Sequence, residues 1–370
     1  MTSAQQRARS FVDDVVRPEL EGWERAAAYP RAAVAASGLT GMFVAPERGG
    51  LGLSYPQAVD VFEELGRGDG SLAFSISMHN AVAAAINAAG TGEVLERWGS
   101  ALVTGEALGC FSLTEPNAGS DAAAIVTRGR PEGGRWRLTG RKAWVTLGGE
   151  ADVYAVVAKT SDAPGHQDIA MFVVARDAPG VSFTEPYRKA SSDFLPITEM
   201  VLAEVPADLL VPPGAGMRAA LGAIDVARFD IAAISNGLLA EALDLAVAYA
   251  KQRRTFGSPI IEHQGISWML ADVATDLEAA RGLTRAAATV LGTAQGRVAV
   301  AHAKRFAPDA ALRGAIACSE VLGAYGWLQQ HQLARLVAVA KMLTVVDGSA
   351  EIQKIVIARE LAGRAARVDR

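Results

Sequence analysis

Four short segments of the chain carry residue types that could do chemistry. Cys110–Asp121 (CFSLTEPNAGSD) contains several hydroxyl groups. Gly140–Thr146 (GRKAWVT) contains a hydroxyl group and a tryptophan, whose indole offers a large apolar surface. Tyr249–Gly257 (YAKQRRTFG) contains two adjacent arginines, and a guanidinium group can fork onto phosphate oxygens. Asp347–Gln353 (DGSAEIQ) contains a carboxyl group that could exchange a proton with a substrate.

Each segment also has a purely structural interpretation. Cys110–Asp121 could be a strand that ends in a turn, and Trp144 could be a core residue of a β module. Lys251–Arg254 could be the solvated end of a helix. The pair Asp347-Gly348 is common in turns and could cap an elbow between two helices. No single segment therefore identifies a site.

Composition and spacing argue against several other chemistries. The five histidines and two cysteines are scattered without metal-ligand spacing, so we expect no metal site. The 36 basic and 40 acidic residues are interspersed and give a net charge of −4, so we expect no nucleic-acid partner. Gly214–Ala219 superficially matches a dinucleotide-binding fingerprint, but it follows prolines and no βαβ unit surrounds it.

The chain has the composition of a globular protein. Its 370 residues are half apolar and 21% charged, which is enough to bury more than one core. The N-terminus lacks the apolar segment of a signal peptide, and no stretch approaches the roughly 18 apolar residues that a membrane span needs. We therefore expect a cytoplasmic protein, with Cys110 and Cys318 as small buried residues.

Hydrophobic periodicity divides the chain into three parts. The first, to about residue 108, is mostly helical and includes the alanine-rich run Ala81–Ala89. The second, to about residue 211, predicts short strands at Ile125–Arg128, Arg135–Thr139, Tyr154–Lys159, Met171–Ala175 and Met200–Ala203. The third returns to the helical period, with expected helices at about 299–322, broken near Pro308, at about 332–345 and at about 350–363.

The four segments occur in an order and at spacings that resemble the flavin-dependent acyl-CoA dehydrogenases, over essentially the whole chain. The resemblance implies an α+β fold: an N-terminal helical domain (1–108), a central β-barrel-like domain (109–211) and a C-terminal four-helix bundle (212–370). It implies FAD held between the barrel and the bundles. The implied reaction is α,β-dehydrogenation of an acyl thioester.

By this resemblance the flavin ring lies against the β domain. Trp144 would pack on its face, while Thr114 and Thr146 would offer hydroxyl groups and backbone donors to its polar edge. The full set of implied cofactor contacts within the chain is Leu113, Thr114, Ser120, Trp144, Thr146, Ser349 and Glu351.

The resemblance also implies a role for a second subunit. Arg253, Phe256 and Gln264 would reach the adenosine-diphosphate half of the neighbouring subunit's FAD. Arg254 beside Arg253 leaves the register open by one residue. We therefore expect a homodimer or a homotetramer.

The resemblance places Asp347 where most family members carry a glutamate base. Aspartate loses about 1.5 Å of reach, and an error of about 1 Å in a catalytic group can cost about 100-fold in rate. Some relatives carry the base elsewhere, at the position of Ala227, where this chain has no carboxylate. Arg228 either orients the base or the substrate carbonyl, or pairs structurally with Asp225 or another nearby carboxylate.

The expected substrate is an acyl thioester on CoA or on a carrier protein, with an electron acceptor such as an electron-transfer flavoprotein. Two alternatives stay open: a flavin monooxygenase or oxidase on the same fold, and a catalytically weak subunit of a hetero-oligomeric dehydrogenase. Departures from the family pattern at Glu320, Ala324 and Ala338-Val339 indicate a divergent branch.

Overall fold

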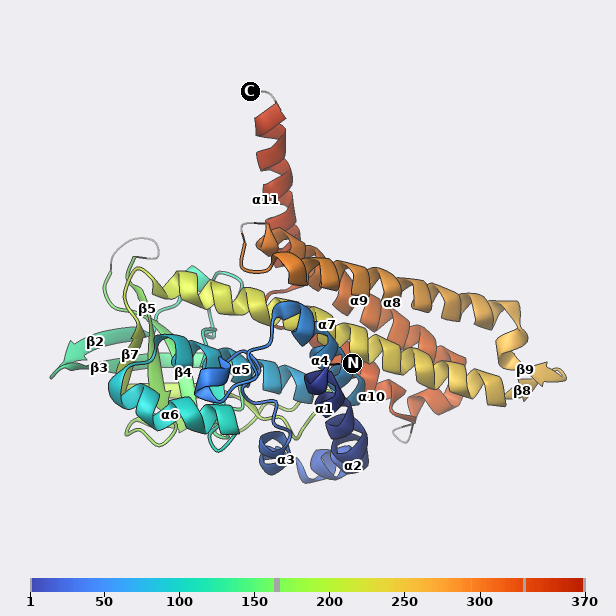
Figure 1. Cartoon of the computed structure of the whole chain (residues 1–370), viewed down its shortest axis with the longest axis horizontal. Coiled ribbons are helices and arrows are strands. Elements are labelled where there is room, and N and C mark those ends of the chain that lie inside the picture. Colours follow the sequence, from blue (N-terminus) through green and yellow to red (C-terminus); the bar gives the residue numbers. More distant parts are fainter. Residues whose placement is uncertain (1, 163–166, 294, 329–330, 369–370) are drawn as a thin grey trace. The chain divides into compact units, whose positions relative to one another are not determined.

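The computed structural model describes residues 2–162, 167–293, 295–328 and 331–368, with side chains to residue 363 (Figure 1). The chain forms two compact units, which are described separately. The bundle unit comprises Met1–Pro18, Tyr55–Phe74 and Arg228–Arg370, and the barrel unit comprises Glu19–Ser54 and Ser75–Ala227. The predicted order of helical, β-rich and helical segments is confirmed.

The barrel unit is built on seven strands. Their bounds are β1 (Gly109–Ser112), β2 (Arg128–Glu132), β3 (Arg135–Thr146), β4 (Val153–Lys159), β5 (Ile169–Ala175), β6 (Val181–Phe183) and β7 (Ile197–Val211). Strands β4, β2, β3, β7 and β5 pair in turn, and β5 pairs back to β4, which closes a barrel. The apolar runs of β4 and β5 are buried on both faces, as continuous Val/Ala-rich strands require. The expected β-barrel-like domain is confirmed.

Helices cover this barrel. They are most of α2 (Arg17–Ala26), α3 (Arg31–Ala36), the second part of α5 (Gly70–Ala89), α6 (Gly92–Thr104) and the first turns of α7 (Gly216–Gln252), with short 3-10 turns η2 (Pro46–Arg48) and η3 (Ala122–Ala124). Val82 and Ile86 of α5 share one buried cluster with Leu102 of α6 and with inward-facing residues of β4 and β5. The small side chains of α5 allow this close packing.

One predicted strand was placed too early. The sequence predicted a strand at Ile125–Arg128, but β2 begins only at Arg128. The N–H groups of Val126 and Thr127 donate instead to the buried carboxylate of Glu115, at 2.6 and 3.0 Å. A side chain distant in sequence thus takes the bonds that a neighbouring strand would have supplied.

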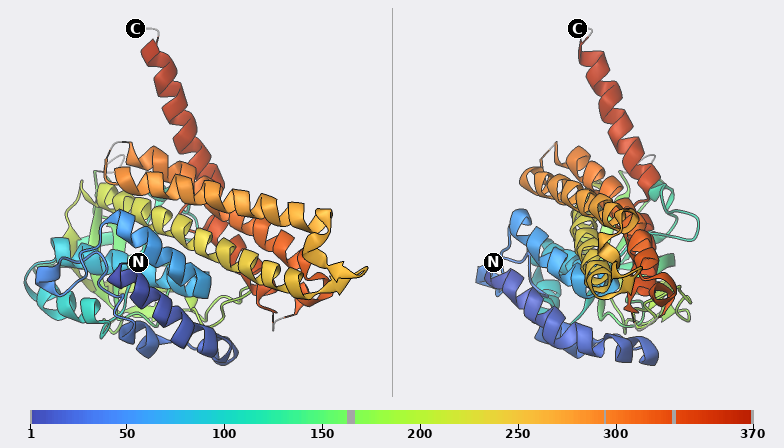
Figure 2. Two further views of the ribbon diagram at one scale, coloured as in Figure 1. Left: turned by 45° about the vertical axis from the view of Figure 1, so that its right-hand side comes forward. Right: turned by 90° about the vertical axis from the view of Figure 1, so that its right-hand side faces the viewer.

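The bundle unit contains the long helices. Its elements are α1 (Ser3–Phe11), the π-helical turn η1 (Val12–Val16), α4 (Tyr55–Gly68), the first part of α5, most of α7, η4 (Ile260–Glu262), α8 (Gln264–Val290), α9 (Gly296–Val321), η5 (Gly323–Trp327), α10 (Leu333–Val345) and α11 (Ala350–Val368). The hairpin β8 (Arg254–Thr255) and β9 (Ser258–Pro259) joins α7 to α8. Helix α9 packs against α8, α10 and α11, and α11 then extends away from the other helices of this unit (Figure 2).

The predicted break at Pro308 was wrong. Helix α9 runs without interruption from Gly296 to Val321, and Pro308 lies buried within it. A proline inside a helix costs roughly 3 kcal/mol, and the packing of α9 on three other helices offsets that cost. Cys110 and Cys318 are both buried and unbridged, as expected.

Two helices are more apolar than the sequence expectation allowed. Gly70–Ala89 and Gly216–Gln252 are long and apolar enough, by length and composition, to cross a membrane. In both, 72% of the apolar window is buried inside the protein, as in the core helices of soluble proteins.

Candidate active site

The structure brings together the predicted residues at the start of the barrel. The segment after β1 runs beside the end of β3, because the N–H of Ala143 donates to the carbonyl of Thr114 at 2.9 Å. Lys142 reaches the carbonyl of Leu113, also at 2.9 Å. Leu113 and Thr114 therefore lie next to the strand segment that carries Trp144.

Trp144 has an unusual backbone conformation. Its φ is 57°, a left-handed value that is a genuine outlier for a bulky side chain. The register of β3 on β7 shifts between Lys142 and Val145, and this bulge turns Trp144 outward. The side chain is 63% exposed and its ring lies 4.7 Å from that of Tyr187. An indole supported from one side is thus presented to solvent or to a ligand.

The other two predicted barrel residues differ in exposure. Ser120 is exposed in the turn that follows the Glu115–Ala118 bridge. Thr146 is buried at the end of β3, where it pairs with Ile197. The turn at Ser120 is accessible to a ligand, whereas Thr146 offers a buried hydroxyl two residues beyond Trp144.

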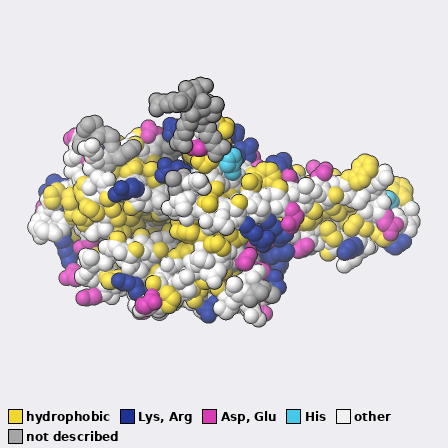
Figure 3. Space-filling view, turned by 45° about the horizontal axis from the view of Figure 1, so that its top comes forward, with side chains coloured by type: hydrophobic (Ala, Val, Ile, Leu, Met, Phe, Trp, Pro, Cys, Tyr) yellow, Lys and Arg dark blue, Asp and Glu magenta, His cyan; other side chains and the backbone are white. Residues whose placement is uncertain are grey.

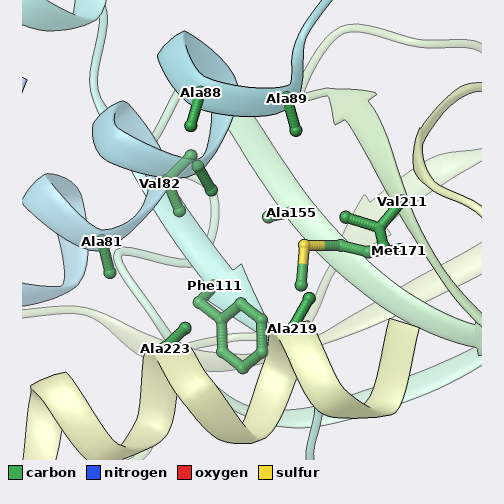
Figure 4. Close-up of a pocket in the computed structure, with 11 residues that line it drawn as sticks. Ala81, Val82, Ala88, Ala89, Phe111, Ala155, Met171, Val211, Ala219 and Ala223 are labelled. Carbon is green, nitrogen blue, oxygen red and sulfur yellow. The ribbon is translucent and has the colours of Figure 1, made fainter. Parts of the chain in front are cut away.

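The barrel unit also contains an apolar pocket of about 140 Å³, which Figure 4 shows in close-up. It is lined by α5, the first turns of α7 and four strands, through Ala81, Val82, Ala85, Ala88, Ala89, Phe111, Ala155, Met171, Val211, Ala219 and Ala223. None of these side chains is charged, so the pocket can accept only an apolar group. The sequence signal for this pocket was the alanine-rich run Ala81–Ala89, from which only helical structure was predicted.

In the bundle unit, Asp347 lies on an elbow between α10 and α11. Its φ is 52° and that of Gly348 is 101°, so two consecutive residues are left-handed. The Arg228 Nε donates to the backbone carbonyl of Asp347 at 2.8 Å, and the Gln353 Nε2 donates to that of Gly348 at 3.0 Å. A Cβ at Gly348 would lie 2.8 Å from the Arg228 guanidinium, so glycine is needed there.

The carboxyl group of Asp347 is poised for proton exchange. The residue as a whole is only half-buried, but its Oδ2 is buried and has no hydrogen-bond partner among the described residues. Burial raises its pKa to about 6, against the opposing charges of Lys304 and Arg228. In a capping aspartate, a carboxylate oxygen accepts a hydrogen bond from a backbone N–H. Asp347 is therefore not the helix cap that its Asp-Gly sequence allowed.

Ser349 and Glu351 form the start of α11. A side-chain hydrogen bond from Ser349 lowers the pKa of the exposed Glu351 carboxyl. The carbonyl of Ser349 accepts from the N–H of Gln353. Both predicted cofactor residues therefore act locally at a helix N-terminus, where acidic groups are favourable.

Arg253, Phe256 and Gln264 gather at the β8–β9 hairpin. All three are exposed, and Phe256 is fully exposed with a φ of 51°. Arg254 donates to the carbonyl of Gly257 at 2.7 Å, so the hairpin itself occupies that arginine. This favours Arg253 in the register that the sequence left open.

This hairpin group is remote from the elbow. Arg228 and Gln252 lie 24 residues apart in one continuous helix, α7, which corresponds to about 36 Å along the axis. The elbow and the hairpin therefore cannot contact the same end of one cofactor. Figure 3 shows hydrophobic side chains at the surface of the hairpin end, on the right of the view, and the exposed aromatic residues of this part include Phe256, Trp268, Tyr325 and Trp327.

Two further charged residues, Lys142 and Lys304, were not identified from the sequence. Both are buried, at 0% and 2% exposure. The position of Lys304 carried a signal, because it falls on the apolar stripe of Val300, Ala307 and Ala311. Among the described residues, no group of three or more His, Cys, Asp or Glu side chains could hold a metal ion.

Comparisons with known proteins cover nearly the whole chain. Three family models match: the N-terminal (residues 2–106), middle (110–205) and C-terminal (214–362) domains of acyl-CoA dehydrogenase. A Bacillus subtilis (strain 168) acyl-CoA dehydrogenase is 35% identical over 364 residues, 96% of each chain.

Two solved structures share the fold. Butyryl-CoA dehydrogenase from Megasphaera elsdenii is 31% identical with a TM-score of 0.92, over 98% of this chain and 99% of that one. A glutaryl-CoA dehydrogenase from Mycobacterium smegmatis, in complex with FADH2, is 28% identical with a TM-score of 0.90, over 97% and 94%.

Proposed function

Since the chain belongs to the acyl-CoA dehydrogenase family, FAD-dependent oxidoreductases that act on CH–CH groups, we propose that Asp347 is the base of an α,β-dehydrogenation of an acyl thioester. The observation that carries the proposal is the buried Oδ2 of Asp347, which no described residue meets with a hydrogen bond. A pKa of about 6 leaves most of this carboxyl ionised at neutral pH and still close to the pH at which it must accept a proton.

Asp347 accepts the α-proton on a carboxylate oxygen. Arg228 holds the backbone carbonyl of Asp347, which fixes the direction of the shorter side chain. We assign the backbone N–H of Asp347 to the thioester carbonyl oxygen, where a donor acidifies the α-carbon. Bound FAD supplies the acceptor for the hydride that leaves the β-carbon.

The residues at the barrel fit an uncharged aromatic ring. Trp144 presents an exposed indole, and the neighbouring Leu113, Thr114 and Thr146 carry no charge. We assign these residues, with Ser120, to the flavin and its ribityl-phosphate arm. Ser349 and Glu351 at the start of α11 are kept as proposed FAD contacts of the bundle unit.

We assign Arg253, Phe256 and Gln264 to the cofactor of a second copy of the chain. The separation of about 36 Å along α7 supports this assignment, because one chain cannot use both ends on one flavin. The exposed aromatic residues at the hairpin end are those expected of a contact surface. The holoenzyme is therefore a homodimer or a homotetramer.

Substitution at the hairpin tests the second-copy assignment. Arg253→Ala should weaken FAD binding about 10- to 100-fold, the loss typical of a hydrogen bond to a charged group. Arg254→Ala is the matched control, because Arg254 bonds within the hairpin. FAD content and mass by light scattering are measured together. Equal FAD retention in both variants would contradict the assignment.

The substrate is an acyl thioester carried on CoA or on the phosphopantetheine arm of a carrier protein, and the electrons pass to an acceptor such as an electron-transfer flavoprotein. Anaerobic bleaching of the bound flavin by a panel of both thioester types tests the reaction and separates the carriers. Reduction only by an external reductant would instead indicate a monooxygenase or oxidase. FAD content without reduction by any thioester would indicate a subunit that needs an active partner.

A further inference from the structure

Lys304 is a buried cation that the proposed reaction does not yet use. It lies on α9 with only 2% of its surface exposed, on the same helix face as Val300, Ala307 and Ala311. Burying an ammonium group is costly unless it is paired or hydrogen-bonded. We therefore expect the Lys304 ammonium group to have hydrogen-bond acceptors or opposite charges nearby.

The first partner is the end of helix α10. The Lys304 Nζ donates to the backbone carbonyl of Leu343 at 2.7 Å, in the last turn of α10 and four residues before Asp347. Carbonyls of a last helical turn lack intrahelical partners, and a cation there also complements the helix dipole. Lys304 thus anchors the helix end from which the Asp347 elbow begins.

Lys304 also acts through space on the carboxyl group of Asp347. The charged groups that act on Asp347 are Lys304 from α9 and Arg228 from α7. Those that act on Lys304 are Asp347, Arg228 and Asp309. Arg228 directs its Nε to the backbone carbonyl of Asp347, so two cations hold the elbow through two different backbone carbonyls.

We propose that Lys304 is a positioning residue, which fixes the α10 side of the elbow and keeps the Asp347 carboxylate ionised for proton transfer. This inference rests on the proposed role of Asp347 as the base. Burial lowers the pKa of Lys304 to about 8 and raises that of Asp347 to about 6. Both groups are charged together mainly between these two values, so their attraction is confined to that window.

The first experiment follows the pH dependence of anaerobic flavin reduction in a single turnover. Lys304→Met removes the charge and Lys304→Gln keeps a donor for Leu343. Both should move the midpoint of the rate upward by about one pH unit, because the loss of a nearby opposite charge raises a carboxyl pKa. Lys341→Met removes an exposed lysine of α10 as the matched control and should leave the midpoint in place.

A second readout does not depend on activity. The loss of Tm caused by either Lys304 substitution is compared in the wild-type and Asp347→Asn backgrounds at pH 7 and pH 5. The proposal expects a smaller loss in the Asp347→Asn background at pH 7 and equal losses at pH 5, where Asp347 is protonated. If Lys304→Met does not fold, Lys304→Gln completes the cycle.

The outcomes separate the two proposals. An unchanged midpoint with a uniformly lower rate, or equal Tm losses in both backgrounds at pH 7, would overturn the role of Lys304 while leaving Asp347 as the base. Undiminished flavin reduction by Asp347→Asn would overturn the proposed base, and the catalytic role of Lys304 with it.

Discussion

Each unit of this protein buries one lysine beside one carboxyl group, and the two pairs end in opposite electrostatic states. In the barrel, the Lys142 Nζ donates to the Glu115 carboxylate at 2.7 Å and to the carbonyl of Leu113. In the bundle, the Lys304 Nζ donates to the backbone carbonyl of Leu343 and acts on Asp347 as a nearby charge, with no side-chain hydrogen bond between the two among the described residues. Burial lowers the pKa of both lysines to about 8.

The carboxyl groups make the difference. Burial pushes the pKa of Glu115 upward, but Lys142 and the N–H groups of Val126 and Thr127 outweigh burial and lower it. In the part of the chain that the structure describes, no such bond reaches the buried Oδ2 of Asp347, so burial prevails and its pKa rises to about 6. The carboxylate of Glu115 is held ionised by its hydrogen bonds and suits a structural role. The carboxyl group of Asp347 can bind and release a proton near neutral pH, which suits a catalytic role.

The largest effect expected from this contrast is on the reaction. Asp347→Asn should retain FAD but lose substrate-driven flavin reduction by about 100- to 10,000-fold, the usual contribution of a general base. Stopped-flow anaerobic reduction measures the loss. Glu115→Gln, the matched change in the other pair, should lower the stability of the fold rather than the rate of flavin reduction. Comparable reduction rates for Asp347→Asn and wild type would rule out Asp347 as the base.

The next largest effect is on the stability of the barrel pair. Lys142→Met leaves Glu115 ionised in the interior without its cation, which costs about 3–5 kcal/mol. Urea unfolding at pH 7 gives the free energy of unfolding. Lys304→Met should cost less, because Asp347 can bind a proton near neutral pH and relieve its charge. A larger loss for Lys304→Met would reverse the assignment of the two pairs.

Asp347→Asn and Glu115→Gln should change the free energy of unfolding in opposite directions. The folded pKa of Asp347 lies above its ordinary value of 3.8, so its contribution to stability is complete below pH 4 and is lost as the pH rises through 6. Above pH 6 the variant should be more stable than wild type by up to about 3 kcal/mol. Unfolding at pH 4 and pH 8 tests this, and a variant less stable at pH 8 contradicts it.

The smallest effect is the position of the pH profile in the wild-type enzyme. The rate of anaerobic flavin reduction should rise with pH through a midpoint near 6, as Asp347 loses its proton. The measurement spans pH 5 to 7.5, over which Lys304, with a pKa of about 8, stays mostly charged. A midpoint near the ordinary pKa of aspartate would show that burial does not control this group in the working enzyme.

Much of the fold could be predicted from the sequence because its signals are local. Alternating and continuous apolar runs predicted β3, β4 and β5, and the helical period predicted α10 and α11. The errors arose where distant residues intervened. Glu115 delayed β2 by taking two backbone N–H groups, and helix packing carried α9 through Pro308.

The candidate site divides in the same way. Asp347, Trp144 and Arg253 were identified because each lies in a short segment whose residue types and order are distinctive. Lys304 was missed because no motif surrounds it, and Lys142 was passed over within Gly140–Thr146 because the residue type alone does not predict burial. Their burial depends on what packs over them in the folded chain.

The amino-acid sequence alone determined which groups are available: one carboxyl group on an Asp-Gly elbow, an indole on a strand and an arginine at the end of a helix. Only the tertiary structure decided their states, because a pKa and a backbone conformation depend on neighbours distant in the sequence. Arg228, 119 residues before Asp347, holds its elbow, and the bulge of β3 on β7 turns Trp144 outward. Burial without a bonding partner then left Asp347 able to exchange a proton near neutral pH.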